Sequence, residues 1–191
     1  MPIEIIEESV TAAGLARYSE ISAAFQVESL LGLALIEDGL GGVEFTEIPV
    51  GEPWVKDYDE REAPTEWVRR FDVSNWVLLT AYDSEERVGG AVIALDTPAL
   101  HMLEGRRDLT VLWDLRVAPE ARGRGVGESL FRAVETSSRS RGCHDLQVET
   151  QNINVPACRF YRQMGCTLGA VNRFAYPDLP DEVQLLWFKN L

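Results

Sequence analysis

A glycine-rich stretch in the middle of the sequence carries residue types that could hold a phosphate group. The run from Leu115 to Leu130 reads LRVAPEARGRGVGESL and passes from an apolar segment into glycine and arginine. Val126, Leu130 and Val134 recur every four residues, which is typical of a helix. A strand, a glycine loop and a helix in this order place backbone N–H groups around one point, as proteins do to hold a diphosphate. The stretch predicts a site for a phosphate-bearing cofactor, with a glycine-rich turn that binds nothing as the alternative.

A tyrosine on a second predicted helix could supply a proton. The run from Asn154 to Gly165, NVPACRFYRQMG, begins with a residue that commonly caps helices and ends with the glycine that commonly terminates them. Tyr161 shares a helical face with Phe160 and Met164, so a core aromatic is one interpretation. A phenol has an unperturbed pKa of about 10 and is protonated at neutral pH. The other interpretation of Tyr161 is therefore an acid that protonates a leaving group.

Both stretches resemble motifs of the GNAT superfamily of acyl-CoA-dependent N-acyltransferases. The spacing Arg122-x-x-Gly125-x-Gly127 behind a strand ending in LxVxP is similar to the family's coenzyme-binding motif, R/Q-x-x-G-x-G/A. The run from Asn154 to Gly165 resembles the family's NxxAxxxYxxxGF signature and departs from it only at Cys166, where phenylalanine is usual. Within the superfamily, the sequence most resembles the streptothricin acetyltransferases.

The resemblance implies acetyl-CoA as the acetyl donor and assigns residues to its binding. In the family, the end of the strand pairs with the pantetheine arm, and the amides of the loop hold the pyrophosphate. The corresponding residues here are Leu115, Arg116, Val117, Arg122, Gly123, Arg124, Gly125, Val126 and Gly127. Asn154 would cap its helix and contact the pantetheine. Tyr161 would protonate the departing coenzyme A thiolate in a direct transfer.

Two carboxylates could receive the proton that an amine acceptor must lose. An alkylammonium has a pKa of about 10.4, so a group has to accept its proton before the nitrogen attacks. Glu149 lies twelve residues before Tyr161, which resembles the spacing in bacterial enzymes that acetylate the N-terminal alanine of a ribosomal protein, where the glutamate is the general base. Asp114 is the rival. For each, an acid that only anchors the cationic substrate is the other interpretation.

The acceptor that the resemblance implies is a small cationic amine. Residues 149–158, ETQNINVPAC, and residues 53–58, PWVKDY, are similar to runs in streptothricin acetyltransferases, which acetylate the β-lysine amino group of a cationic antibiotic. On this basis Asp57, Tyr58 and Asp59 are the substrate-side candidates. Two other functions stay open: acetylation of a protein's N-terminal alanine or lysine, and a non-catalytic acyl-CoA-binding module.

The first part of the chain predicts a strand, helices and a second strand. Pro2–Ile6 is an expected edge strand, residues 12–35 have the spacing of one or two helices, and residues 43–50 form an expected strand. Residues 51–66 are acidic and rich in turn formers, so a loop over a site and a solvated surface connection are both open.

The later segments predict an α/β fold with the mixed twisted sheet of the GNAT type. Strands are expected at residues 76–81, 88–95, 109–117, 144–150, 167–174 and 183–188, and helices at about residues 125–141 and 155–164. A polar link favours a hairpin between the first two of these strands, whereas the helices favour crossovers. We expect a sheet that is antiparallel in its first half and has strand–helix–strand crossovers in its second. Helices should cover both faces, in one domain spanning residues 1–191.

Composition narrows the class of partner. The chain has 191 residues, of which 46% are hydrophobic and 26% charged, as in globular proteins. Its net charge of −13 argues against nucleic acid as a partner and favours cationic molecules. The acidic N-terminus lacks the basic residues of a signal peptide, and no window approaches a membrane span, so no membrane partner is expected.

Cysteine and histidine usage indicates a cytoplasmic protein without a metal. The three cysteines have neither CxxC spacing nor a complete set of pairs, which is typical of reduced thiols. Neither histidine has a partner at metal-ligand spacing. The oligomeric state stays open, a homodimer included.

Overall fold

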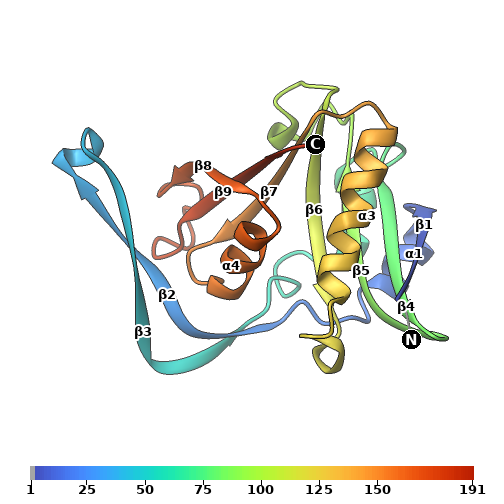
Figure 1. Ribbon diagram of the computed structural model, residues 1–191, viewed down its shortest axis with the longest axis horizontal. Helices are drawn as coiled ribbons and strands as arrows, with labels where there is room; N and C mark the ends of the chain where they lie inside the picture. Colours follow the sequence, from blue (N-terminus) through green and yellow to red (C-terminus); the bar gives the residue numbers. More distant parts are fainter. Residues whose placement is uncertain (1–2) are drawn as a thin grey trace. The chain divides into compact units, whose positions relative to one another are not determined.

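The computed structural model describes residues 3–191 and contains nine strands and four α-helices (Figure 1). The strands are β1 Glu4–Ser9, β2 Phe25–Ile36, β3 Gly42–Lys56, β4 Val77–Asp83, β5 Glu86–Ala94, β6 Leu109–Val117, β7 Asp145–Gln151, β8 Thr167–Asn172 and β9 Gln184–Asn190. The helices are α1 Ala12–Tyr18, α2 Trp67–Arg70, α3 Val126–Ser140 and α4 Val155–Gln163, with short 3-10 turns η1 Glu37–Gly39, η2 Pro64–Glu66, η3 His101–Leu103 and η4 Pro119–Ala121. The expected α/β class is confirmed, although Pro2 of the first expected strand lies outside the described residues. None of the described helices is long and apolar enough to cross a membrane.

The strands form two sheets, and the chain divides into two compact units. One sheet has the strand order β1-β4-β5-β6-β7-β9-β8, and β2 and β3 form the other. Unit 1 comprises Met1–Ala23, Tyr58–Val148 and Phe188–Leu191, and unit 2 comprises Ala24–Asp57 and Glu149–Trp187. The expectation of one domain stays a prediction.

The sheet of unit 1 changes from hairpins to a crossover, as expected. β1 pairs with β4, β4 with β5 and β5 with β6, all antiparallel. β6 and β7 are parallel, from Leu109 opposite Asp145 to Leu112 opposite Val148. Parallel neighbours need a long connection, and α3 provides it.

Helices lie on both faces of β5, as two adjacent glycines show. Successive residues of a strand point to opposite faces of the sheet, so Gly89 and Gly90 face opposite sides. A side chain at Gly89 would meet Leu130 and Val126 of α3, each at 3.1 Å, whereas one at Gly90 would meet the Tyr18 ring at 2.7 Å. Tyr18 ends α1, so the two glycines let α1 and α3 approach from opposite sides. Figure 1 shows α3 running in front of β5.

An aromatic cluster fills part of the core of unit 1. The rings of Trp67, Phe71, Trp76 and Trp113 pack with centroids 5.4 to 6.4 Å apart. The buried indole N–H of Trp76 donates to the Thr97 hydroxyl at 2.8 Å, so the cluster leaves this polar group satisfied. Trp113 is part of β6, so the cluster supports the strand that leads into the glycine loop.

Unit 2 begins with a long two-stranded ribbon where the sequence predicts a helix. β2 pairs antiparallel with β3, so the prediction of helices over residues 12–35 is wrong beyond α1. Residues 51–56, expected as a loop, are the end of β3. The physical reason is cross-strand pairing, which overrides the helix propensity of leucine and alanine.

The end of α4 follows the prediction made from its glycine. Gly165 has φ +84°, its N–H donates to the Arg162 carbonyl at 3.1 Å, and the N–H of Cys166 donates to the Tyr161 carbonyl at 3.0 Å. These bonds form the glycine-terminated cap that ends many helices. The cap fixes the turn that carries Tyr161.

Asn152 joins three segments of unit 2 through four hydrogen bonds. Its side-chain oxygen accepts from the N–H of Val183 at 2.8 Å, and its Nδ2 donates to the carbonyl of Leu31 at 3.2 Å. Its own N–H donates to the Val183 carbonyl at 3.0 Å, and its carbonyl accepts from the N–H of Leu31 at 2.9 Å. Asn152 is not among the residues predicted from the sequence to have a role.

Replacing Asn152 with Ala should lower the free energy of unfolding by about 2–4 kcal/mol, because two half-buried backbone groups lose their partners, each at the lower end of the range of about 1–3 kcal/mol. Urea unfolding followed by circular dichroism measures the loss. Asn154→Ala, which removes only a helix cap, is the control and should cost about 1 kcal/mol. Equal losses in the two variants would contradict this account of Asn152.

Candidate active site

The loop between η4 and α3 presents a row of backbone N–H groups. Gly123 and Gly125 have φ of +74° and +82°, and a side chain at either would meet nothing within 4 Å, so backbone conformation rather than crowding favours glycine. Within the described part of the chain, the N–H groups of residues 123–128 donate to no backbone carbonyl. Because α3 begins at Val126, the last three belong to its first turn. Together these groups can hold a diphosphate.

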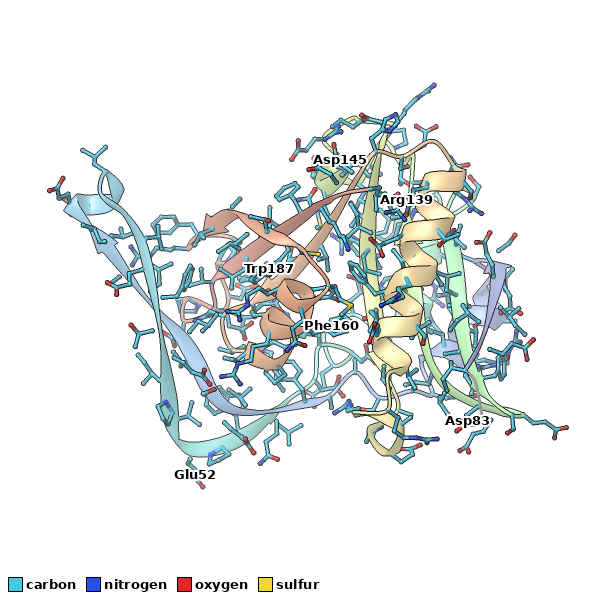
Figure 2. The ribbon with its side chains drawn as sticks, in the orientation of Figure 1. Glu52, Asp83, Arg139, Asp145, Phe160 and Trp187 are labelled. Atoms are coloured by element: carbon cyan, nitrogen blue, oxygen red, sulfur yellow. The ribbon has the colours of Figure 1, made fainter. Side chains whose placement is uncertain are left out.

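Two exposed arginines add positive charge to this loop. Arg122 Nε donates to the Val117 carbonyl at 3.1 Å, so its side chain lies against the strand end. Arg124 Nη2 lies 2.5 Å from the carboxylate of Asp83. Asp83 is the last residue of β4 and is labelled in Figure 2. The side chain of Val126 is buried, so this residue can offer a ligand only its backbone.

The strand end before the loop offers backbone rather than a charged side chain. Leu115, Arg116 and Val117 lie opposite Ala91, Gly90 and Gly89 of β5. Only 3% of the Arg116 side chain is exposed, and its guanidinium is occupied inside unit 1. The predicted contact of Arg116 with a pantetheine arm is therefore open to its backbone alone.

A buried ion-pair network surrounds Arg116. Its guanidinium donates to both oxygens of Asp59, at 2.8 and 3.1 Å, and to Oδ2 of Asp114, at 2.9 and 2.5 Å. It also donates to the Ile21 carbonyl at 3.0 Å and lies 4.7 Å from the ring centre of Tyr18. The network brings together three residues that the sequence assigns to different roles: a donor contact, a base candidate and a substrate candidate.

Asp114 has a perturbed pKa within this network. Burial raises the pKa of its carboxyl above the ordinary value, although Arg116 opposes this shift. Burial and the charge of Asp114 likewise raise the pKa of Tyr18 well above its ordinary value, so this phenol stays protonated. Because Arg116 occupies Oδ2 of Asp114, the carboxylate serves as a counter-ion.

The other two substrate candidates, Asp57 and Tyr58, lie directly after β3 and are half-buried. The carbonyl of Tyr58 accepts from the N–H groups of Arg61 and Glu62, at 3.0 and 3.2 Å, which closes the turn after the strand. Asp59 lies in this turn, so its ion pair with Arg116 fastens the turn to β6.

In unit 2, three side chains hold the carboxylate of Glu149. The hydroxyl of Tyr176 donates to Oε1 at 2.5 Å, Gln151 Nε2 donates to the same oxygen at 3.2 Å, and Gln184 Nε2 donates to Oε2 at 2.6 Å. Burial and the charge of Glu149 raise the pKa of Tyr176, so its hydroxyl stays a donor. A carboxylate has about four lone-pair sites, so these bonds orient Glu149 and leave a site on Oε2 for a substrate or water.

Tyr161 and Asn154 are fixed by α4. Asn154 caps the helix, because its side-chain oxygen accepts from the N–H of Ala157 at 3.2 Å. Tyr161 is buried and packs edge-to-face against Phe160, with ring centres 5.1 Å apart. Cys158 is also buried, and burial raises the pKa of its thiol, which suits packing rather than nucleophilic attack.

A family model described as acetyltransferase (GNAT) family matches residues 43–166, more than half of the chain. The chain belongs to the GNAT acetyltransferase family. The matched residues include the glycine loop, Glu149 and Tyr161.

Streptothricin acetyltransferase A of Bacillus subtilis is 27% identical over 150 residues, which are 75% of this chain and 78% of the relative. A streptothricin acetyltransferase of Escherichia coli is 34% identical over 84 residues, 42% of this chain and about half of the relative, at 48%. Among solved structures, a Bacillus anthracis protein described as a streptothricin acetyltransferase, in complex with acetyl coenzyme A, has a TM-score of 0.77. It is 24% identical and covers 100% of this chain and 99% of that chain, so the likeness supports the GNAT fold.

Sequence reasoning missed two residues of this GNAT acetyltransferase that act on Glu149. Neither Tyr176 nor Gln184 is among the residues predicted from the sequence to have a role. They contact Glu149 across 27 and 35 residues of chain, so no local spacing joins them to it. A polar residue at the start of the last strand, on the face opposite the buried Leu185 and Trp187, is the one signal that could have identified Gln184.

Proposed function

We propose that the protein transfers the acetyl group of acetyl-CoA to a primary amine of a small cationic acceptor, such as a streptothricin-like antibiotic. The observation that carries the proposal is the carboxylate of Glu149, which three neutral donors hold in one orientation. Membership of the GNAT acetyltransferase family supports the reaction class, and the two streptothricin acetyltransferases support the acceptor class.

The glycine loop suits the diphosphate of the donor. When bound, acetyl-CoA supplies an acetyl group activated as a thioester. The backbone N–H groups of residues 123–128 would hold its diphosphate, and Arg122 and Arg124 would add charge. Asn154 and the backbone of Leu115 to Val117 are proposed to contact the pantetheine.

Glu149 is proposed to act on the acceptor amine. An ammonium group must lose a proton before its nitrogen can attack a carbonyl carbon. The lone-pair site left on Glu149 Oε2 can accept this proton, directly or through a water molecule, or can anchor the ammonium. Asp114 is less suited to this role, because its carboxylate pairs with the charged guanidinium of Arg116, whereas the three donors to Glu149 are neutral.

Tyr161 is proposed to protonate the leaving group. Tyr161 would donate its phenolic proton to the departing thiolate as the C–N bond forms and the C–S bond breaks, and Glu149 would receive the proton that the amine loses. A phenol is protonated at neutral pH and can donate to a thiolate as charge develops on it. The buried Cys158 takes no part in this direct transfer.

The acceptor class is tested by measuring thiol release from acetyl-CoA with a panel of acceptors. The panel contains streptothricin, polyamines, aminoglycosides, lysine and an alanine-initiated peptide. We expect turnover with a small cationic amine, and a KM for it that rises with ionic strength, because salt screens attraction to a chain of net charge −13. Turnover of the peptide alone would instead establish a protein acetyltransferase. Binding of coenzyme A without turnover of any amine would indicate a non-catalytic module. The variant Tyr161→Phe serves as the inactive control for the assay.

A further inference from the structure

Apolar side chains are exposed along the ribbon formed by β2 and β3. Nine large hydrophobic side chains are exposed among residues 3–191, and seven of them lie between residues 25 and 56. Leu40, in the turn of the ribbon, is 94% exposed. A two-stranded ribbon is marginally stable in water, and a concentration of exposed apolar side chains marks an interaction surface. These side chains make the ribbon a candidate interaction surface.

The two free edges of the ribbon differ in chemistry. β2 and β3 each have one strand neighbour, so each has a free edge. β3 contains the residues that proteins use to prevent edge pairing: Pro49 and Pro53, which lack an N–H, and charged Glu44 and Glu47. The stretch of β2 from Gly32 to Ile36, GLALI, has no charge and no proline. Edge pairing is therefore open to β2 and disfavoured at β3.

The direction of the backbone groups of β2 follows from Leu31. Its N–H donates to the Asn152 carbonyl, and its carbonyl accepts from Asn152 Nδ2, so both groups point away from β3. The register with β3 is unshifted from Ser29 to Ile36, and outward-pointing residues alternate along an antiparallel strand. Leu33 and Leu35 therefore also direct their N–H and carbonyl groups outward.

We propose that this edge of β2 pairs with the same edge of a second copy of the chain, about a two-fold axis at Ala34. Leu33 of one copy then lies opposite Leu35 of the other, and each such pair exchanges both of its backbone hydrogen bonds. The two ribbons form one four-stranded antiparallel sheet, and the interface is isologous, as in most dimers. Pairing about Ala34 brings residues 32–36 of the two copies opposite one another, because the outward groups of Leu31 already bond Asn152. The exposed side chains of Leu35, Ile36 and Leu40 lie in or beside this stretch.

Charge selects this arrangement over pairing through β3. Two copies with a net charge of −13 repel each other, so a dimer must join them through neutral surface. Pairing through β2 places the two β3 strands about 14 Å apart, three strand spacings, so Glu44 and Glu47 of the two copies lie beyond the screening length of about 8 Å. Pairing through β3 would bring these carboxylates within about 5 Å of one another.

Sedimentation equilibrium of the full chain, with a matched pair of variants, tests the proposal. Leu33→Pro removes an outward N–H from β2, and Phe45→Pro, directly opposite in the register, removes one from β3. We expect a dimer for the wild type, dimerisation weakened at least tenfold by Leu33→Pro, and a dimer retained by Phe45→Pro. A wild type that is monomeric at all concentrations overturns the proposal, whatever else binds the ribbon.

A cross-link tests the register and does not depend on how proline is tolerated. Ala34 would face its own copy as a non-hydrogen-bonded pair, with Cα atoms about 4.5 Å apart, which a disulfide can span. Ala34→Cys should form a disulfide-linked dimer under mild oxidation, whereas wild type should not, because its three cysteines are buried. A dimer that survives Leu33→Pro and fails to cross-link through residue 34 also overturns the proposal.

Discussion

Glu149→Gln is expected to lower kcat/KM for the acceptor amine about 100-fold and to leave the KM for acetyl-CoA unchanged, since a positioned general base contributes about 10²–10⁴-fold. The carboxylate accepts from Tyr176 and Gln184 on its two oxygens. A glutamine amide has one oxygen, so its NH₂ group must face one of these donors, and the new side chain offers the amine no proton acceptor. Initial rates over a matrix of amine and acetyl-CoA concentrations measure both constants.

The pH dependence separates a base from an anchor. If Glu149 accepts the proton, Glu149→Gln lowers kcat and removes the acid limb of the pH–rate profile. If it only anchors the ammonium, the KM for the amine rises and kcat stays. Tyr176→Phe deletes one donor and keeps the carboxylate, so it should have a smaller effect in the same direction, as expected of a positioning residue. A rate loss in Asp114→Asn with none in Glu149→Gln would assign the base to Asp114 and contradict the proposed role.

Segments with a single clear period could be predicted closely from the sequence. β6 lies at its expected bounds, Leu109–Val117, and α3 begins and ends within one residue of the expected helix. Both have local signals: β-branched and apolar residues before a turn, and apolar residues recurring every four positions. The glycine loop could also be predicted from the sequence, because the positive φ of Gly123 and Gly125 is a local requirement of the backbone.

β2 could not be predicted because its sequence satisfies two patterns at once. Leu31, Ala34 and Leu35 have the spacing of a helix face, while the whole run from Phe25 to Ile36 is apolar enough for a strand. The choice is made by pairing with β3, an interaction between distant residues. The uncharged part of this run, Gly32–Ile36, is the free edge that we assign to a second copy.

Arg116 shows what motif reading leaves out. Its position in the LxVxP strand end assigns it to the donor, yet its side chain reaches Asp59, 57 residues earlier in the chain. Nothing in the spacing of the strand indicates a buried guanidinium, because the partners come from other segments. The side chain that looks like part of the binding machinery is in this structure a part of the core.

Arg116→Met is therefore expected to lower the free energy of unfolding by about 3–5 kcal/mol, because removing one partner of a buried ion pair leaves charges without compensation. Arg116 faces Asp59 and Asp114, and both carboxylates would lose their cation at once. Guanidinium unfolding of wild type and variant at pH 7 measures the loss. Arg116→Lys keeps the charge but not the forked geometry of the guanidinium, so this variant should recover only part of the stability that Arg116→Met loses.

The origin of this loss can be tested through pH and through the partner residues. Burial already raises the pKa of Asp114, and removing the arginine, which opposes the shift, raises it further. A carboxyl whose pKa is higher in the folded than in the unfolded state binds its proton more tightly when folded, so stability falls as pH rises between the two values. The stability deficit of Arg116→Met should therefore shrink from pH 7 toward pH 4.

Combining Arg116→Met with Asp59→Asn and Asp114→Asn should also restore stability at pH 7. A deficit that persists in this triple variant would show that packing of the Arg116 side chain, not its charge, stabilises this core.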